Sequence, residues 1–249
     1  MKTIPILMQP DMVRAILDGR KTQTRRLKGL EEINDRPDDW DFFEDFSDKS
    51  GYYIFLENDL MEVSFHTKPK VAPGDIFWVR ETFKVGAWIL ESNKVAFDYK
   101  ASPEIKKTPW CFMGNWFNKE FVKIVGELDK KGIHPNYKGY FKWEPGESPL
   151  NWKPSIHMPK AACRLWLKVN DVRAERLQSI TDDDCVCEGI DHYYNRDFRQ
   201  VRYKDYSKAA PGCYKPQRFF RVEDPILGYG EWEEPKESFK SLWQSINVK

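Results

Sequence analysis

A short polar segment from Gly19 to Arg26 holds the residues of this sequence best suited to chemistry. Its sequence is Gly-Arg-Lys-Thr-Gln-Thr-Arg-Arg, so Lys21 and Thr24 lie three residues apart. That spacing brings two side chains to one face of a helix-like bend. A threonine hydroxyl becomes a nucleophile when a base takes its proton, and a desolvated lysine can lose its charge and act as that base. The pair predicts nucleophilic chemistry or, as the plainer alternative, an ion-paired lysine beside a threonine that caps a turn.

Two helices are expected to position this segment and its partners. Apolar residues at helical spacing and a closing Gly19 predict a helix over 11–18, which ends just before the polar segment. A capping box that begins at Thr181 and a closing Gly189 predict a second helix over 181–188. Each helix would place its candidate residues in or just after its C-terminal turn.

The rest of the chain favours short strands, one more helix and long insertions. Runs rich in strand-forming residues predict strands at 4–9, 76–81, 94–99 and 164–169, the last continuing towards Leu177. Apolar residues on one face predict a closing helix over 235–247. Stretches without a sustained period predict insertions at about 28–70, 100–150 and 191–230. We therefore expect an α+β fold in a single domain, 1–249, with long loop insertions.

The polar segment resembles the G-x-K-x-x-E-x-R signature of the ASCH family, with Thr24 in the place of the usual glutamate. A threonine there, within Gly-Arg-Lys-Thr-x-Thr, is similar to the small ASCH proteins that hydrolyse N4-acetylcytidine. Four other segments resemble a larger family of ASCH-like proteins from phages and prophages: 73–75, 78–81, 155–159 and 179–181. These segments span most of the chain.

The resemblance implies a PUA-like (ASCH) β-barrel of roughly five or six strands with flanking helices. In the resembled proteins a final strand usually follows the segment that matches 243–247 and completes the barrel. This sequence ends at Lys249. The resemblance therefore leaves open which segment would close the barrel.

The resemblance also implies a reactive centre made of Lys21, Thr24 and Glu188, in which Lys21 activates Thr24 as the nucleophile and Glu188 comes from the later helix. Glu188 lies in the last turn of that expected helix, where the helix dipole disfavours a negative charge. Its carboxylate should hold a proton or need a cation beside it, and Lys21 would be that cation. An ion pair keeps Lys21 charged, whereas the role of base requires it to be neutral, and the sequence leaves both open.

Six further residues are expected to bind the substrate around this centre. Arginines suit a phosphate group, a tryptophan next to polar residues suits a base, and a histidine in a loop bounded by prolines could line a pocket. The candidates are Arg20, Arg26, Trp78, Arg80, Glu81 and His157. Each has an ordinary alternative: a solvated charge for the arginines, a core position for Trp78 and a loop position for His157.

Composition restricts the setting of the protein. The formal net charge is +1, so no whole-molecule field favours nucleic acid, and no apolar run is long enough for a membrane span. Five cysteines, an odd number, suit a reducing compartment, and Cys185-Val-Cys187 lacks the spacing of a metal site. We expect a cytoplasmic protein without metal or other cofactor and without membrane contact.

Two charged stretches add alternative partners. Acidic and aromatic residues gather in 31–48, and basic and aromatic residues gather in 196–221. The second composition is typical of single-strand binding. Three functions are therefore open: an amidohydrolase for N4-acetylcytidine or a related modified nucleoside or nucleobase, a non-catalytic module that reads a base in RNA or DNA, and a phage accessory protein that binds a host protein.

Overall fold

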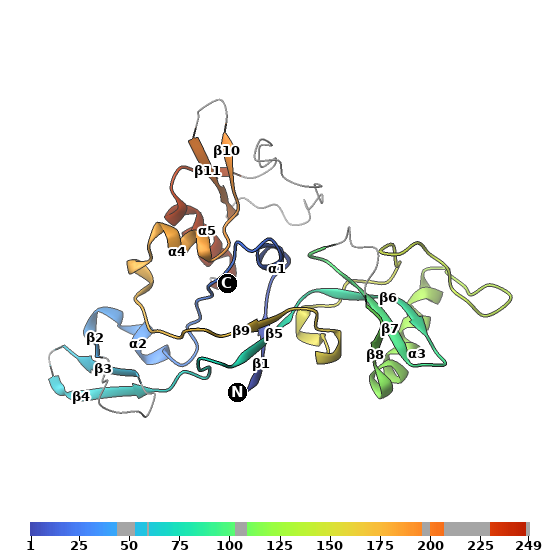
Figure 1. The fold of residues 1–249 in the computed structure, drawn as a ribbon, viewed down its shortest axis with the longest axis horizontal. Helices are drawn as coiled ribbons and strands as arrows, with labels where there is room; N and C mark the ends of the chain where they lie inside the picture. Colours follow the sequence, from blue (N-terminus) through green and yellow to red (C-terminus); the bar gives the residue numbers. More distant parts are fainter. Residues whose placement is uncertain (44–52, 59, 103–108, 196–199, 207–229, 248–249) are drawn as a thin grey trace.

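The computed structural model describes residues 1–43, 53–58, 60–102, 109–195, 200–206 and 230–247 (Figure 1). The described strands form four separate three-stranded sheets. Each sheet lies in or beside its own cluster of buried apolar residues. In Figure 1, one sheet occupies the centre and the other three belong to lobes that extend from it.

The central sheet is formed by β1 (Thr3–Leu7), β5 (Ile76–Arg80) and β9 (Trp166–Lys168). β5 is the middle strand, parallel to β1 and antiparallel to β9. Helix α1 (Pro10–Leu17) follows β1, and its buried Val13 packs with Ile6 and Val79 of the sheet. This packing positions the end of α1 in space, and hence the start of the polar segment that follows it.

The lobe at the right of Figure 1 contains β6 (Phe83–Ile89), β7 (Lys94–Tyr99), β8 (Cys111–Phe112) and α3 (Gly114–Lys130). Its core is the largest of the clusters and includes Phe83 and Phe97 from the sheet and Phe117 from α3, all fully buried. Three short 3-10 turns follow later in the chain, at Ser155–His157, Lys160–Ala162 and Leu177–Ser179.

The lobe at the lower left contains α2 (Glu31–Asp35), a 3-10 turn (Pro37–Asp39), β2 (Trp40–Phe43), β3 (Tyr53–Glu57) and β4 (Leu60–Thr67). The upper lobe contains α4 (Asp182–Cys187), β10 (His192–Asn195), β11 (Gln200–Asp205), β12 (Gly230–Trp232) and α5 (Pro235–Asn247). Its core joins Cys185 of α4 to Phe239 and Leu242 of α5. α4 is thus held against α5.

The mixed α and β class is confirmed, but no closed barrel is found among the described residues. The predicted helices over 11–18, 181–188 and 235–247 correspond to α1, α4 and α5. The strand expected from 164 towards Leu177 is wrong beyond Lys168, where β9 ends. The Asp171 carboxylate accepts a hydrogen bond from the next backbone N–H, an alternative to a strand's ladder.

All three of the expected loop insertions contain regular structure, and the described part of 191–230 includes β10 and β11. The 28–70 segment folds into α2 and the β2–β3–β4 sheet around buried Trp40 and Phe55. The 100–150 segment contains the 17-residue helix α3. Its buried positions Phe117, Ile124 and Leu128 follow helical spacing. Tryptophans, glycines and lysines around these positions interrupt the pattern, so the sequence of this segment shows no sustained helical period. None of the described helices is long and apolar enough to cross a membrane.

Candidate functional site

The polar segment after α1 is clamped against the end of α4 by backbone hydrogen bonds. The Lys21 N–H donates to the Ala15 carbonyl, and the N–H groups of Thr22 and Gln23 donate to the Cys187 carbonyl. Gly189 permits this approach, because a Cβ at that position would lie 2.8 Å from the Cβ atoms of both Ala15 and Lys21. Gly189 also has a φ of 88°, which favours glycine. The glycine at position 189 therefore allows the ends of α1 and α4 to lie in contact.

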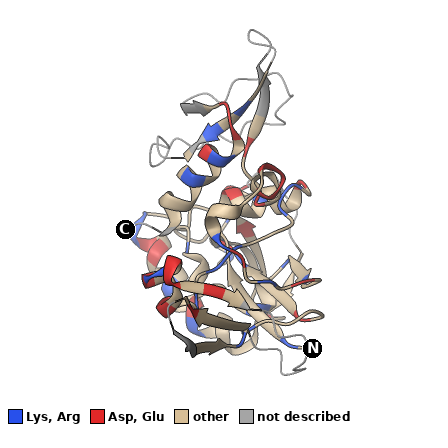
Figure 2. Cartoon of the chain, turned by 90° about the vertical axis from the view of Figure 1, so that its left-hand side faces the viewer, with Lys and Arg blue, Asp and Glu red and all other residues tan. Residues whose placement is uncertain are grey.

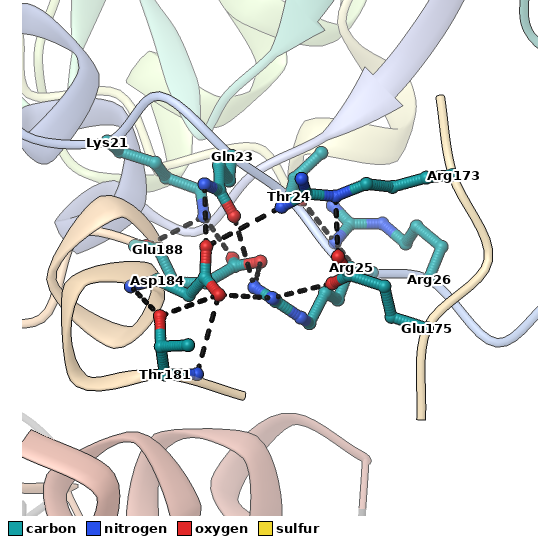
Figure 3. A network of polar contacts seen from close by, with 10 residues as sticks. All are labelled: Lys21, Gln23, Thr24, Arg25, Arg26, Arg173, Glu175, Thr181, Asp184 and Glu188. Atoms are coloured by element: carbon teal, nitrogen blue, oxygen red, sulfur yellow. Dashed lines mark hydrogen bonds and ion pairs between the residues drawn. The ribbon is translucent and has the colours of Figure 1, made fainter. Parts of the chain in front are cut away.

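Lys21 and Glu188 form a buried ion pair at this junction (Figure 3). The Lys21 Nζ lies 2.7 Å from Glu188 Oε2 and also donates to the Glu188 backbone carbonyl at 2.7 Å. Their side chains are only 2% and 6% exposed. Burial lowers the pKa of Lys21, and the Glu188 carboxylate opposes that shift. The helix end and its carboxylate thus obtain the cation that the dipole argument required.

Arg25 completes the coordination of Glu188. Its Nη1 lies 3.1 Å from Glu188 Oε1, so each oxygen of this carboxylate faces a cation. Its Nη2 lies 3.1 Å from Glu175 and 3.6 Å from Asp184. Asp184 also accepts from the Gln23 amide at 2.9 Å, and this bond, with others from Thr181, lowers the pKa of Asp184. Glu188 is therefore held in one orientation by a network.

Thr24 belongs to the same segment but faces a different partner. Its Oγ1 accepts a hydrogen bond from Arg26 Nη1 at 2.7 Å. Arg26 also donates to the Arg25 carbonyl at 2.7 Å and, more distantly, to the Leu7 carbonyl at 3.5 Å. Within the described part of the chain, no hydrogen bond joins Thr24 to Lys21. The structure thus pairs Lys21 with Glu188 and pairs Thr24 with Arg26.

A pocket of about 340 Å³ lies beside Glu188. Its polar side chains are those of Gln9, Arg25, Arg26, Thr82, Ser155 and Glu188. Its apolar side includes Met8, Met12, Phe239, Leu242, Trp243 and Ile246, the last four from α5. Figure 3 shows α5 passing below the network as the pale red helix. Neither Lys21 nor Thr24 lines the pocket, so Lys21 is connected to it through the Glu188 carboxylate.

The other predicted substrate-binding residues lie outside the pocket lining, with the exception of Arg26. Arg20 donates to the Gly189 and Ile190 carbonyls and pairs with Asp191 at 3.0 Å, which ties the segment to the chain after α4. His157 is exposed, and Ser155, two residues earlier in the same turn, lines the pocket.

Three of the predicted residues lie in or beside the central sheet. Trp78 is buried in the middle strand, and the Arg80 guanidinium lies 5.3 Å from its ring centroid. Arg80 also donates to the Ile156 carbonyl. Glu81 is buried and forms two 2.8 Å hydrogen bonds with Arg164. The three side chains therefore have partners within the protein.

Sequence reasoning missed the aromatic wall of the pocket. Phe239, Leu242, Trp243 and Ile246 follow helical spacing, which predicts an amphipathic helix but not what that helix covers. The signal that could have found them is the position of Arg25 and Arg26 in the sequence, since two arginines after a helix need a counterpart. Arg25 belongs to the same polar segment and is not among the residues that the sequence predicts for the site.

Among the described residues, no group of three or more histidine, cysteine or acidic side chains could hold a metal ion. Comparison of the chain with models of known protein families, with curated proteins and with solved structures finds no match. The site is therefore interpreted from its own geometry.

Proposed function

We propose that the protein is an amidohydrolase of N4-acylated cytidine or a related modified nucleoside, with Lys21, Thr24 and Glu188 as its reactive centre. The observation that carries the proposal is the buried Lys21–Glu188 pair, whose carboxylate opens onto a pocket. Burial lowers the pKa of Lys21, and an ionisable group with a perturbed pKa beside a cleft is a candidate for function. The resemblance to the ASCH hydrolases adds the substrate class.

In the proposed reaction, the Lys21 ammonium first passes its proton to Glu188. Thr24 Oγ1 then attacks the acyl carbon, and its own proton moves to the neutral Lys21 amine. The cytosine N4 leaves with that proton, and the acyl group stays on Thr24 as an ester. Water hydrolyses the ester, which restores the Thr24 hydroxyl and releases the carboxylic acid. These reaction steps require the Thr24 side chain to rotate away from Arg26 and towards Lys21.

A non-catalytic module that reads a base in the same pocket is the second candidate. It is favoured by the bond from Arg26 to Thr24 and by the two acceptors that engage the Lys21 ammonium. A hydrolase and a binding module share the pocket but differ in their need for Thr24. Binding of a host protein stays a prediction from the sequence.

The test is release of cytidine from N4-acetylcytidine, measured by chromatography. We expect turnover by the wild type and none by Thr24→Ala. Thr22→Ala is the matched control, because Thr22 is an exposed threonine of the same segment. Its hydrogen bond to the Cys187 carbonyl is made by the backbone N–H, which the substitution keeps. Full turnover by Thr24→Ala would remove Thr24 as nucleophile, and no turnover by the wild type would favour the binding module.

A further inference from the structure

The charged network beside the pocket has one cation more than it has carboxylates. Figure 3 shows its cations, Lys21, Arg25, Arg26 and Arg173, and its carboxylates, Glu175, Asp184 and Glu188. Lys21, Arg25 and Arg173 each form an ion pair with one or more of these carboxylates. Arg26 forms none with any carboxylate of the described residues. The excess positive charge therefore lies on Arg26.

Arg26 is held in place by neutral groups and lines the pocket. Its Nη1 donates to Thr24 Oγ1 and to the Arg25 carbonyl, and its Nη2 to the Leu7 carbonyl. No contact with the described residues uses its Nε, and the residue is exposed. The Glu188 carboxylate attracts the charge of Arg26 from beyond ion-pair distance. A guanidinium with a fixed orientation and no direct ion pair among the described residues is suited to a phosphate group, to which it can donate two parallel hydrogen bonds.

The apolar side of the pocket offers a flat surface near this cation. Trp243 of α5 is half-buried, lines the pocket and packs on Phe239 with the ring centroids 5.9 Å apart. Aromatic side chains of this kind stack on nucleobases, because every base has a π-face. Trp243, and not the buried Trp78, is therefore the stacking residue that the pocket presents.

The size and charge of the site favour a single nucleotide over a strand. A volume of about 340 Å³ lies near the lower end of the ~300–1,000 Å³ typical of small-ligand pockets. Strand binding needs a row of available cations. Of the basic stretch at 196–221 the structure describes 200–206, and there Arg202 pairs with Glu233 and Lys204 with Asp11. Figure 2 shows Lys and Arg interspersed with Asp and Glu in that view of the chain.

We propose that the pocket takes a pyrimidine nucleoside 5′-monophosphate, with its base against Trp243 and its phosphate on Arg26. The pyrimidine identity rests on the proposed function, whereas the phosphate and the stacking rest on the pocket alone. A phosphate that draws the Arg26 guanidinium to itself would also release the Thr24 hydroxyl, which accepts a hydrogen bond from Arg26 in the structure.

Isothermal titration calorimetry with two probes tests the phosphate contact. N4-acetylcytidine 5′-monophosphate should bind the wild type about tenfold more tightly than N4-acetylcytidine, the worth of one charge-assisted hydrogen bond. Arg26→Ala should bind both probes equally. Lys100→Ala is the matched control, because the exposed Lys100 lines a separate hollow beside Gln9 and Pro10, and it should retain the preference. Arg26→Gln, which keeps hydrogen-bond donors without the charge, guards against a folding defect in the alanine variant.

Equal affinity of the wild type for both probes overturns the inference, as does a preference that persists in Arg26→Ala and Arg26→Gln. Tighter binding of inorganic phosphate or of a single-stranded RNA than of the monophosphate overturns it too. A monophosphate preference without hydrolysis supports this inference and contradicts the amidohydrolase. Hydrolysis of the nucleoside without any preference for the phosphate does the reverse.

Discussion

Two buried ion pairs join distant parts of this chain, Lys21 with Glu188 and Arg164 with Glu81, and they differ in how their carboxylates are enclosed. Arg164 holds both oxygens of Glu81 at 2.8 Å, contacts Ser102 at 3.2 Å and lies 4.2 Å from the Tyr99 ring centroid. Glu81 is 1% exposed. Glu188 shares its oxygens between two cations and opens onto a pocket.

The difference separates an ion pair that supports the fold from one that can react. An arginine guanidinium stays charged at any pH a protein tolerates, so Arg164 cannot give up its proton to another group. A buried lysine can exchange its proton, and burial already lowers the pKa of Lys21. Lys21 can therefore give up its proton more readily than an ordinary lysine, and its partner Glu188 lines the pocket.

The largest effect on stability is expected from Arg164→Ala. The change leaves the buried Glu81 carboxylate without its cation, which costs about 3–5 kcal/mol when one partner of a buried pair is removed. Urea unfolding measures the loss, and Arg164→Lys, which keeps the charge, should recover part of it. A loss below that of Lys21→Met would show that the two pairs are ranked in the wrong order.

Gly189→Ala should perturb the Lys21–Glu188 pair without removing a charge. The new Cβ meets the Cβ atoms of Ala15 and Lys21 at 2.8 Å, and the φ of 88° disfavours alanine. Strain of this kind costs about 1–3 kcal/mol. Thermal unfolding and ligand binding should both be impaired. Gly126→Ala in α3 is the control: its Cβ would meet nothing within 4 Å, so it should not destabilise the fold.

Lys21→Met should destabilise the protein less than Arg164→Ala. Arg25 stays 3.1 Å from Glu188 in the variant and retains one cation for the carboxylate. We expect the free energy of unfolding to fall by about 1–2 kcal/mol, which is less than the loss for a buried charge left without any partner. Urea unfolding of the two variants side by side measures the difference, and a Lys21→Met protein that does not fold would contradict the role assigned to Arg25.

The smallest effect concerns pH. Because burial lowers the pKa of Lys21 in the folded protein, the unfolded chain binds more protons between that value and the ordinary 10.5. The stability contributed by this group is complete above 10.5 and is lost as the pH falls through the folded-state pKa. The free energy of unfolding should therefore rise with pH in this window relative to Lys21→Met. A difference that does not change with pH would indicate an unshifted lysine.

The sequence predicted the parts of the site that follow from local signals. Gly19, Thr181 and Gly189 mark helix ends, and these ends determine where Lys21 and Glu188 appear. The dipole argument anticipated that Glu188 would need a cation, and the ion pair that was the plainer alternative is present. Placement of Thr24 could not be anticipated, because one rotamer decides whether its hydroxyl faces Lys21 or Arg26.

The other differences between the predicted and the observed structure arise from tertiary packing. α5 shows a periodic apolar face in the sequence, but its contact with α4 and the pocket is a long-range arrangement that periodicity does not contain. The segment at 28–70 was expected to be a loop insertion, yet Trp40 and Phe55 give it a core of its own. A closed barrel was expected from the resemblance alone, and the described strands form separate sheets instead.

We propose that Lys21 takes part in chemistry, whereas Arg164 only supports the fold. The direct measurement is kcat/KM for N4-acetylcytidine with wild type, Lys21→Met and Arg164→Lys, each corrected for its folded fraction. We predict no product above background for Lys21→Met and turnover within about threefold of wild type for Arg164→Lys, since neither Arg164 nor Glu81 lines the pocket and the change should leave transition-state stabilisation nearly intact. Equal turnover by all three proteins, or equal loss in both variants, would contradict the account.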